Sequence, residues 1–579
     1  MKRHFFSRHM FYNALIPAVI SSLALGLANI ADAVTVGNRI GEAGLATIGI
    51  VMPVYMIYNI FGYGLATGAS LVHVRLMAAG KEEEAKELFS YVIGTAMLIS
   101  VIVAVLGNVF MNQVLSFLGA GNGGEEMMKL CKLYARPLFT ACPIFTLNFL
   151  FYSYLRSDDD PYLAGLGFTV GNVMDVVLNI VLVLLLHHGV SGAILATVTA
   201  QLSSVLIMLV HFFGKKGVLR LTTLRIGFSR VREPFTIGLS TSIRFLFQFL
   251  YLLGVNNLLM RSARVDGEMY VAVFDVVMNV SYVAYSIYEA VGDAIQPLTS
   301  AFYEERDSAC LKDTLLQGLI WGIGLGSALV LAIAVAAPLV ARVFGVQDPV
   351  SVEITASAIR WFCVSCPFAG ASMIFIRFYQ SVGMEKLSAV LTGLRTALVL
   401  FPVTALLGLY DPSDIWRMFA ITEVLSFAIG AVVIVRHGLH KRFKNVPVVS
   451  FTMENSSHEI GMVMDQLGEF FSEHGATMRQ VNTLTMAAEE VCMTTIEKAF
   501  TGREEEYVQI TAIADAGKLI LHIRNSAPRF NPLDMQMGKV AEDADDEILD
   551  SIGILAVKRI AKEFYFRRND SFNMLTVTI

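Results

Sequence analysis

Runs of apolar residues, each about 20 residues long, recur along three quarters of this chain and constrain its fold more than any other feature. Each run is long enough for one helix to cross the hydrocarbon of a bilayer. The runs are continuous rather than alternating, which argues against membrane β-strands. Composition agrees, because only 16% of the 579 residues are charged, whereas soluble domains carry about 25%. We therefore expect an all-α polytopic membrane protein that lies in the lipid bilayer.

The apolar runs predict twelve transmembrane helices. A short basic start, Met1-Lys2-Arg3, precedes the first run, which is too long for a signal peptide and is interpreted as an uncleaved span. The runs fall near residues 14–36, 48–73, 88–110, 134–155, 162–186, 190–213, 234–260, 270–299, 314–341, 355–380, 387–409 and 415–436.

The membrane region repeats itself. Residues 48–64 align with 274–290 at an offset of 226, and both segments contain V-M-x-V. Cys142-Pro143 matches Cys366-Pro367 at nearly the same offset. Six spans per repeat predict two lobes, residues 1–225 and 226–445, related by an axis along the membrane normal. Such lobes can open a central cavity to either face, which favours a transporter. We interpret the C-x-x-C at Cys363 and Cys366 as helix packing, and no metal site is predicted.

Basic residues set the expected orientation. The loop after the sixth predicted span carries six Lys and Arg residues within 215–232, and further basic residues flank alternate loops. The positive-inside rule then predicts that both termini lie in the cytoplasm. We expect the protein to lie in the inner (cell) membrane. The net charge of -5 offers no basic surplus for a nucleic-acid partner.

Two motifs resemble those of the multidrug and toxic compound extrusion transporters. Residues Asn29–Gly37 read NIADAVTVG, and residues Gly189–Thr197 read GVSGAILAT. They are similar to the end of that family's first helix and to its sixth helix. The resemblance covers about residues 10–440 and implies an antiporter, coupled to H⁺ or Na⁺, that exports amphipathic or cationic small molecules.

The same resemblance points to a cation site in the first lobe. Asp32 occupies the family's first-helix aspartate position, where a carboxylate could bind and release a proton or Na⁺; alternatively, it reaches water at the helix end. Asp175 and Asn179 lie four residues apart and so on one helix face. The family often has N-x-x-x-D there, whereas this chain has D-x-x-x-N. Thr197 could complete the site, and a polar contact between helices is the alternative.

A second acidic pair is expected in the other lobe. Glu289 and Asp293 are again four residues apart, and charges at membrane depth are costly enough to suggest function. A cation site and a structural ion pair with Arg244 or Arg395 are both open. The run of three aspartates at 158–160 is interpreted as a solvated cytoplasmic loop.

From about Val446 the sequence predicts one small cytoplasmic α/β-sandwich domain, residues 446–579, in the order helix, helix, strand, strand, loop, helix, strand. It resembles the ATP-binding domain of histidine kinases and anti-sigma factors. The motifs that match are EEVCMT at 489–494, IRNSAPRFNP at 523–532 and DSIGI at 550–554. The nucleotide-site positions implied by this resemblance are Glu490, Thr494, Asn525 and Gly553.

The ATP-site motifs are eroded. Thr494 replaces the family's Mg²⁺-binding asparagine, and Asp550 brings negative charge to the phosphate loop. We therefore expect a regulatory module without kinase or ATPase activity, which needs no cofactor and could contact a cytoplasmic protein partner. Two alternatives stay open: a lipid or polysaccharide flippase of the same superfamily, and a membrane sensor with an ATP-binding signalling tail.

Overall fold

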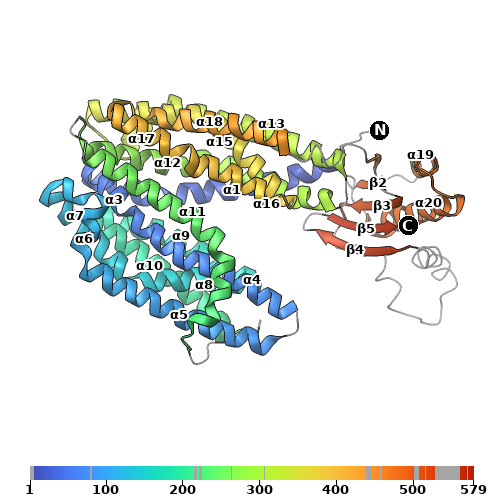
Figure 1. Cartoon of the computed structure of the whole chain (residues 1–579), viewed down its shortest axis with the longest axis horizontal. Coiled ribbons are helices and arrows are strands. Elements are labelled where there is room, and N and C mark those ends of the chain that lie inside the picture. Colours follow the sequence, from blue (N-terminus) through green and yellow to red (C-terminus); the bar gives the residue numbers. More distant parts are fainter. Residues whose placement is uncertain are drawn as a thin grey trace.

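Figure 1 shows a helical membrane region joined to a small domain with a β-sheet, called the tail below. The structure is a computed structural model and describes residues 5–78, 81–158, 160–213, 218–220, 224–262, 264–304, 307–437, 446–454, 459–500, 507–515, 517–527, 561–569 and 572–579.

The first half of the membrane region is a succession of helices broken by short π-helical or 3₁₀ segments. Pro161 begins one of them, at a position where its missing N–H leaves no bond unmade. The helices are α1 (Phe5–Asn29), α2 (Ala31–Ile40), α3 (Glu42–Tyr58), α4 (Gly64–Ala78), α5 (Glu82–Val109), α6 (Met111–Leu118), α7 (Gly124–Thr140), α8 (Cys142–Ser157), α9 (Pro161–Asn179) and α10 (Gly189–Leu209).

The second half has fewer and longer helices. Asp307 and Asp348 cap two of them, because their side chains accept hydrogen bonds from the first backbone N–H groups. The helices are α11 (Phe228–Met260), α12 (Gly267–Glu304), α13 (Ser308–Val335), α14 (Ala337–Val343), α15 (Pro349–Ser381), α16 (Glu385–Gly393), α17 (Leu400–Tyr410) and α18 (Arg417–His437).

Among the described residues, nine helical stretches are long and apolar enough to cross a membrane, or ten when α7 and α8, which meet at 50°, count as one span. The expected spans near 14–36 and 234–260 fall on α1–α2 and on α11, which do not reach this criterion over a full span. Twelve spans in two six-helix repeats therefore remain a prediction.

One helix from each half of the membrane region packs along a helix of the other half. α1 runs along α12, and α11 runs along α4. The α4–α11 contact is close because glycines face it: a Cβ at Gly68 would lie 1.8 Å from the Pro234 carbonyl oxygen, and one at Gly238 would lie 1.9 Å from that of Gly64. This is the small-residue packing that brings membrane helices together.

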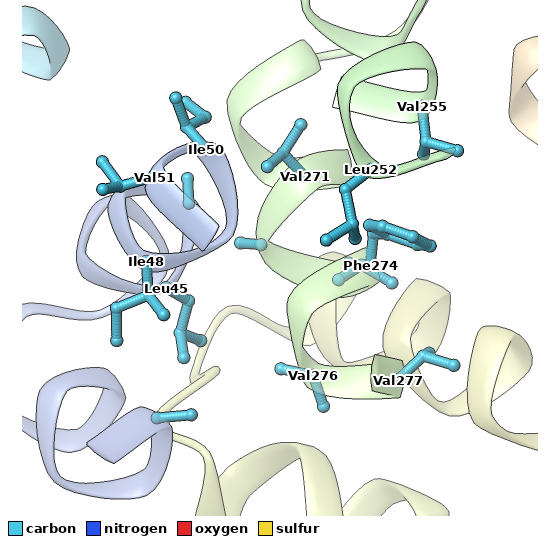
Figure 2. Packing of buried hydrophobic residues seen from close by; sticks show 14 of the residues in the cluster. Leu45, Ile48, Ile50, Val51, Leu252, Val255, Val271, Phe274, Val276 and Val277 are labelled. Carbon is cyan, nitrogen blue, oxygen red and sulfur yellow. The ribbon is translucent and has the colours of Figure 1, made fainter. Parts of the chain in front are cut away.

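The two halves also meet at the end of the bundle away from the tail, which we call the distal seam. There α3 packs against α12, and Gly37 of α2 lies against Phe344. Figure 2 shows the apolar side chains of α3, α11 and α12 that close it, including Ile48, Leu252 and Val271. Toward the tail the two halves diverge, with α4 and α5 on one side and α13 and α16 on the other (Figure 1).

The tail is an antiparallel five-stranded sheet in the order β1-β2-β3-β5-β4. Its elements are β1 (Val448–Glu454), α19 (Ile460–Glu473), α20 (Met478–Thr494), β2 (Tyr507–Asp515), β3 (Lys518–Asn525), β4 (Glu563–Asn569) and β5 (Phe572–Thr578). The predicted helices and central strands are present, but β1 and β4 were not predicted from the sequence. The helix expected before the last strand lies outside the described residues.

Alternation along the strands divides the sheet into two faces. Residues such as Ile510, Leu521 and Val577 pack against α19 and α20 and form the core of the tail. The opposite face carries polar side chains, including Gln509, Thr511 and Arg524, and these are also buried.

Candidate functional site

The first lobe holds a polar cluster made by α9 and α2, in which Asp175 is half-buried. The amide nitrogen of Asn179 donates to the Asp175 carboxylate at 3.2 Å and to the Asp175 carbonyl oxygen at 3.0 Å. The hydroxyl of Thr35 donates to the amide oxygen of Asn179 at 3.5 Å. Asn179 is fully buried and Thr35 is 5% exposed. The swapped D-x-x-x-N order therefore still brings both groups together.

The other two expected members of this cluster are placed less fully. Asp32 lies in α2, three residues before Thr35, and its side chain lies outside the described residues. Thr197 is buried on α10, which packs against α9 and α2, and its hydroxyl donates to the Ala193 carbonyl oxygen at 3.2 Å. Thr35 was not recognised from the sequence, although it stands inside the NIADAVTVG motif.

Glu289 and Asp293 are both exposed on α12. Asp293 pairs with Arg377 of α15 at 3.5 Å. The expected partner Arg395 is instead bonded to Glu423 of α18 at 2.6 Å, and it lies over the ring of Tyr285. The expected ion pair between Arg395 and the Glu289–Asp293 pair is therefore wrong, because the Arg395 side chain is directed into the interior of its own lobe. The side chain of Arg244 lies outside the described residues.

A further acidic residue on α12, Asp275, was not predicted as a site residue from the sequence. It is 3% exposed, and the amide of Asn279 donates to its carboxylate at 3.1 Å. The pair repeats the D-x-x-x-N spacing of Asp175 and Asn179. The repeated spacing could have identified Asp275 from the sequence. It was missed because Asp275 stands beside the apolar V-M-x-V core, which indicates helix packing.

An apolar cavity of about 460 Å³ lies between α3, α5, α8 and α11. Its walls include Tyr58, Phe61 and Phe235, and Arg232 stands among its polar residues. Cavities of this size and character accept drug-sized molecules.

The aspartates at 158–160 do not form a solvated loop. Asp158 and Asp160 are 3% and 6% exposed, and His211 of the helix end after α10 lies between them, at 3.0 and 3.1 Å. Burial alone would raise the pKa of Asp158, but hydrogen bonds from His73, His211 and two backbone N–H groups lower it below its usual range. The expectation of a solvated loop was wrong because these partners come from distant segments; Asp159 lies outside the described residues.

The polar face of the tail docks on the membrane region through Arg524. Its guanidinium lies 3.1 Å from the carboxylate of Asp307, between α12 and α13, and both side chains are fully buried. Thr511 donates to the same carboxylate at 3.3 Å, and the Arg524 guanidinium lies over the ring of Phe302, 4.8 Å from its centroid. Burial raises the pKa of Asp307 and lowers the pKa of Arg524 to about 9. Burial thus disfavours both charged forms, whereas hydrogen bonds from Cys310 and Thr511 lower the pKa of Asp307 and oppose this effect.

Residues 17–185 and 241–406, more than half of the chain, match the family model MatE. This chain belongs to the MATE transporter family. It is therefore a secondary transporter and not an enzyme, and the expected resemblance is confirmed.

Relatives of this MATE chain are multidrug proteins by name. Multidrug export protein MepA of Staphylococcus haemolyticus is 21% identical over 418 residues, which cover 71% of this chain and 90% of that protein. Probable multidrug resistance protein YoeA of Bacillus subtilis is 25% identical over 210 residues, which cover 36% of this chain and 45% of YoeA.

Solved MATE structures share the fold. An inward-facing multidrug resistance MATE transporter superposes with a TM-score of 0.64 at 23% identity, covering 74% of this chain and 99% of that one. The outward-facing form gives 0.55 at 22% identity, covering 77% and 99%. The transporter DinF-BH in complex with the dye rhodamine 6G gives 0.59 at 24% identity, covering 76% and 97%.

The tail of this MATE protein, residues 454–579, matches the Histidine kinase-like ATPase domain. Glu490 and Thr494 are half-buried, four residues apart on α20, and α20 packs against β3, which ends at Asn525. The amide oxygen of Asn525 accepts a hydrogen bond from Asn573 at 2.9 Å. Gly553 lies outside the described residues. The expected loss of nucleotide binding and of kinase or ATPase activity remains a prediction.

Proposed function

We propose that this MATE protein is an antiporter, driven by H⁺ or Na⁺, that exports amphipathic cations from the cytoplasm, with a docked tail that regulates it. The observation that carries the coupling is the Asp175–Asn179–Thr35 cluster. A carboxylate inside a membrane domain costs free energy unless it binds a proton, a cation or hydrogen-bond donors. Ion binding at this cluster would therefore stabilise one state of the cycle.

The substrate class is supported by three features. The relatives are named for multidrug export, and one neighbouring structure contains rhodamine 6G. The 460 Å³ cavity is apolar, and α12 exposes two carboxylates. The flippase and sensor alternatives have no such support.

We infer the orientation from the basic residues, which favour a cytoplasmic tail. In that orientation the halves meet at the extracellular end and diverge toward the cytoplasm (Figure 1).

Transport in proteoliposomes tests the coupling. With an imposed H⁺ or Na⁺ gradient, we expect one of the two ions to drive uptake of rhodamine 6G, and Asp175→Asn to lower that uptake by about tenfold or more, because the carboxylate no longer changes charge. Asp414→Asn is the matched control, since Asp414 sits in an exposed pair with Arg417. Gradient-driven uptake by Asp175→Asn at the wild-type rate would remove Asp175 from the mechanism.

A further inference from the structure

Polar residues form one continuous stripe along α12. They recur every three or four residues, so they lie on one face of the helix. The stripe consists of Asp275, Asn279, Tyr282, Ser286, Glu289 and Asp293. From Asp275 to Asp293 it covers 18 residues, about 27 Å of helix at 1.5 Å per residue. That length is close to the thickness of the hydrocarbon core.

Exposure changes along this stripe. Asp275 and Asn279 are 3% and 5% exposed at the distal seam, whereas Glu289 and Asp293 are exposed nearer the tail. Asp275 faces α3 of the other half: a Cβ at Gly49 would lie 3.3 Å from the Asp275 Cβ and 3.6 Å from one of its carboxylate oxygens. The stripe therefore runs from two exposed carboxylates nearer the tail to a carboxylate enclosed where the halves meet.

Gly49 is the position that the internal alignment pairs with Asp275. Its missing side chain allows α12 to approach closely, because an added Cβ would be tight against the Cβ of Asp275 and against Val271, each at 3.3 Å. Its carbonyl oxygen accepts a hydrogen bond from Asn256 of α11 at 2.9 Å. Three helices thus fix the carboxylate at the seam. A larger residue at Gly49 would crowd it.

The surroundings of Asp275 combine one acid with soft apolar groups. A small cavity of about 10 Å³ at this place is lined by Met52, Met56, Met278 and Phe274. Methionine adapts its shape to different ligands, and aromatic faces attract cations. A carboxylate among such groups suits a delocalised lipophilic cation better than an anion or a sugar.

We propose that Asp275, supported by Asn279, is a cation-recognition site for the transported molecule, which is enclosed in the present conformation and opens when α3 separates from α12. This inference rests on the proposed export of lipophilic cations. The cavity has room for about one water molecule, so an organic cation enters only as the seam widens. Asp275 then selects for positive charge at the distal seam, after the exposed carboxylates Glu289 and Asp293 nearer the tail.

Binding to the purified full-length protein tests this assignment separately from transport. The fluorescence polarisation of rhodamine 6G measures the affinity for a cation, and a neutral dye of similar size gives the comparison. We expect Asp275→Asn to weaken rhodamine 6G binding by about tenfold or more and to leave binding of the neutral dye within twofold. Asp275→Glu, which keeps the charge, should retain most of the affinity for the cation.

The matched control is Asp313→Asn, which removes another buried carboxylate of the same half, paired with Arg8 at 3.2 Å and remote from the seam. Rhodamine 6G affinity of Asp275→Asn within twofold of wild type would overturn the assignment and leave the proposed antiport intact. If Asp275→Asn does not fold, Gly49→Ala decides, because the added Cβ would press on Asp275 at 3.3 Å: unchanged affinity for rhodamine 6G in that variant also overturns the assignment. Failure of the wild type to bind any lipophilic cation would reject the proposed substrate class as well.

Discussion

Arg524 is the residue on which docking of the tail depends most. It is fully buried and contacts Asp307, Gln509 and Phe302. Removing one member of a buried ion pair leaves the other charge uncompensated, which typically costs about 3–5 kcal/mol. The pair therefore fixes where the tail docks, although forming it adds little net stability because both charges leave water.

We expect Arg524→Met to destabilise the docked tail by about 3–5 kcal/mol, and Arg524→Met with Asp307→Asn to recover much of the loss. Asparagine keeps the hydrogen bond that caps α13 and removes the unpaired charge. Hydrogen exchange of the β2 and β3 amides in the full-length protein measures the effect. Arg479→Met, at an exposed site on α20, is the control. Equal protection in the single and double variants would contradict the pair's role.

At this scale the sequence predicted contacts within one helix better than contacts between distant segments. Asp175 and Asn179 share a helix turn, so spacing alone placed them together. Asp307 and Arg524 are 217 residues apart, and His211 lies 53 residues from Asp158. Such contacts depend on how elements pack in space, which spacing along the chain does not encode. Arg395 was assigned the wrong partner for the same reason.

Among the elements, α4 and α11 illustrate packing that small residues make possible. Gly64 and Gly68 form a G-x-x-x-G motif on α4, and Gly238 faces them from α11. A side chain there would collide with backbone, which cannot move aside as a flexible side chain does.

We therefore expect Gly238→Ala to destabilise the protein by about 1–3 kcal/mol through overpacking. Gly254→Ala, on the same helix with nothing within 4 Å of the added Cβ, should be neutral or stabilising by about 0.5–1 kcal/mol. Thermal unfolding of both purified variants in detergent makes the comparison. Equal melting temperatures of the two variants would show that α4 and α11 can move apart at Gly238 without loss of stability.

The long helices were predictable because crossing lipid requires long apolar segments with every backbone group bonded internally. Helix breaks, such as the one at Ile30 between α1 and α2, were not predicted, because the apolar run continues through the break. In the tail, β1 and β4 were missed because the motifs that predicted its order belong to the nucleotide site, and those two strands carry none of them.

In the whole molecule, the tail links two parts of the membrane region. Its sheet contacts Asp307 at the end of α12, and β2 also contacts α1. A docked domain shifts a conformational equilibrium only by the difference in its contacts between the two states. Because α1 packs along α12 in the present state, we expect the docked tail to favour the arrangement in which the distal seam is closed. A state in which α1 leaves α12 would lose the contact between α1 and β2.

We expect removal of residues 446–579 to shift the protein toward the state with an open distal seam. Ala46 is fully buried on α3, three residues before Gly49, and Ala46→Cys places a thiol at the seam. The six native cysteines are all buried, so they add little background. A membrane-impermeant thiol reagent applied from outside should label Cys at this position about twofold faster or more without the tail, as expected for a population shift of a few tenths of a kcal/mol. Arg524→Met should give the same change in the full-length protein, because it loosens docking while keeping the tail. Equal labelling rates in the full-length protein, the tail deletion and Arg524→Met would mean that the docked tail has no influence on which face of the transporter is open.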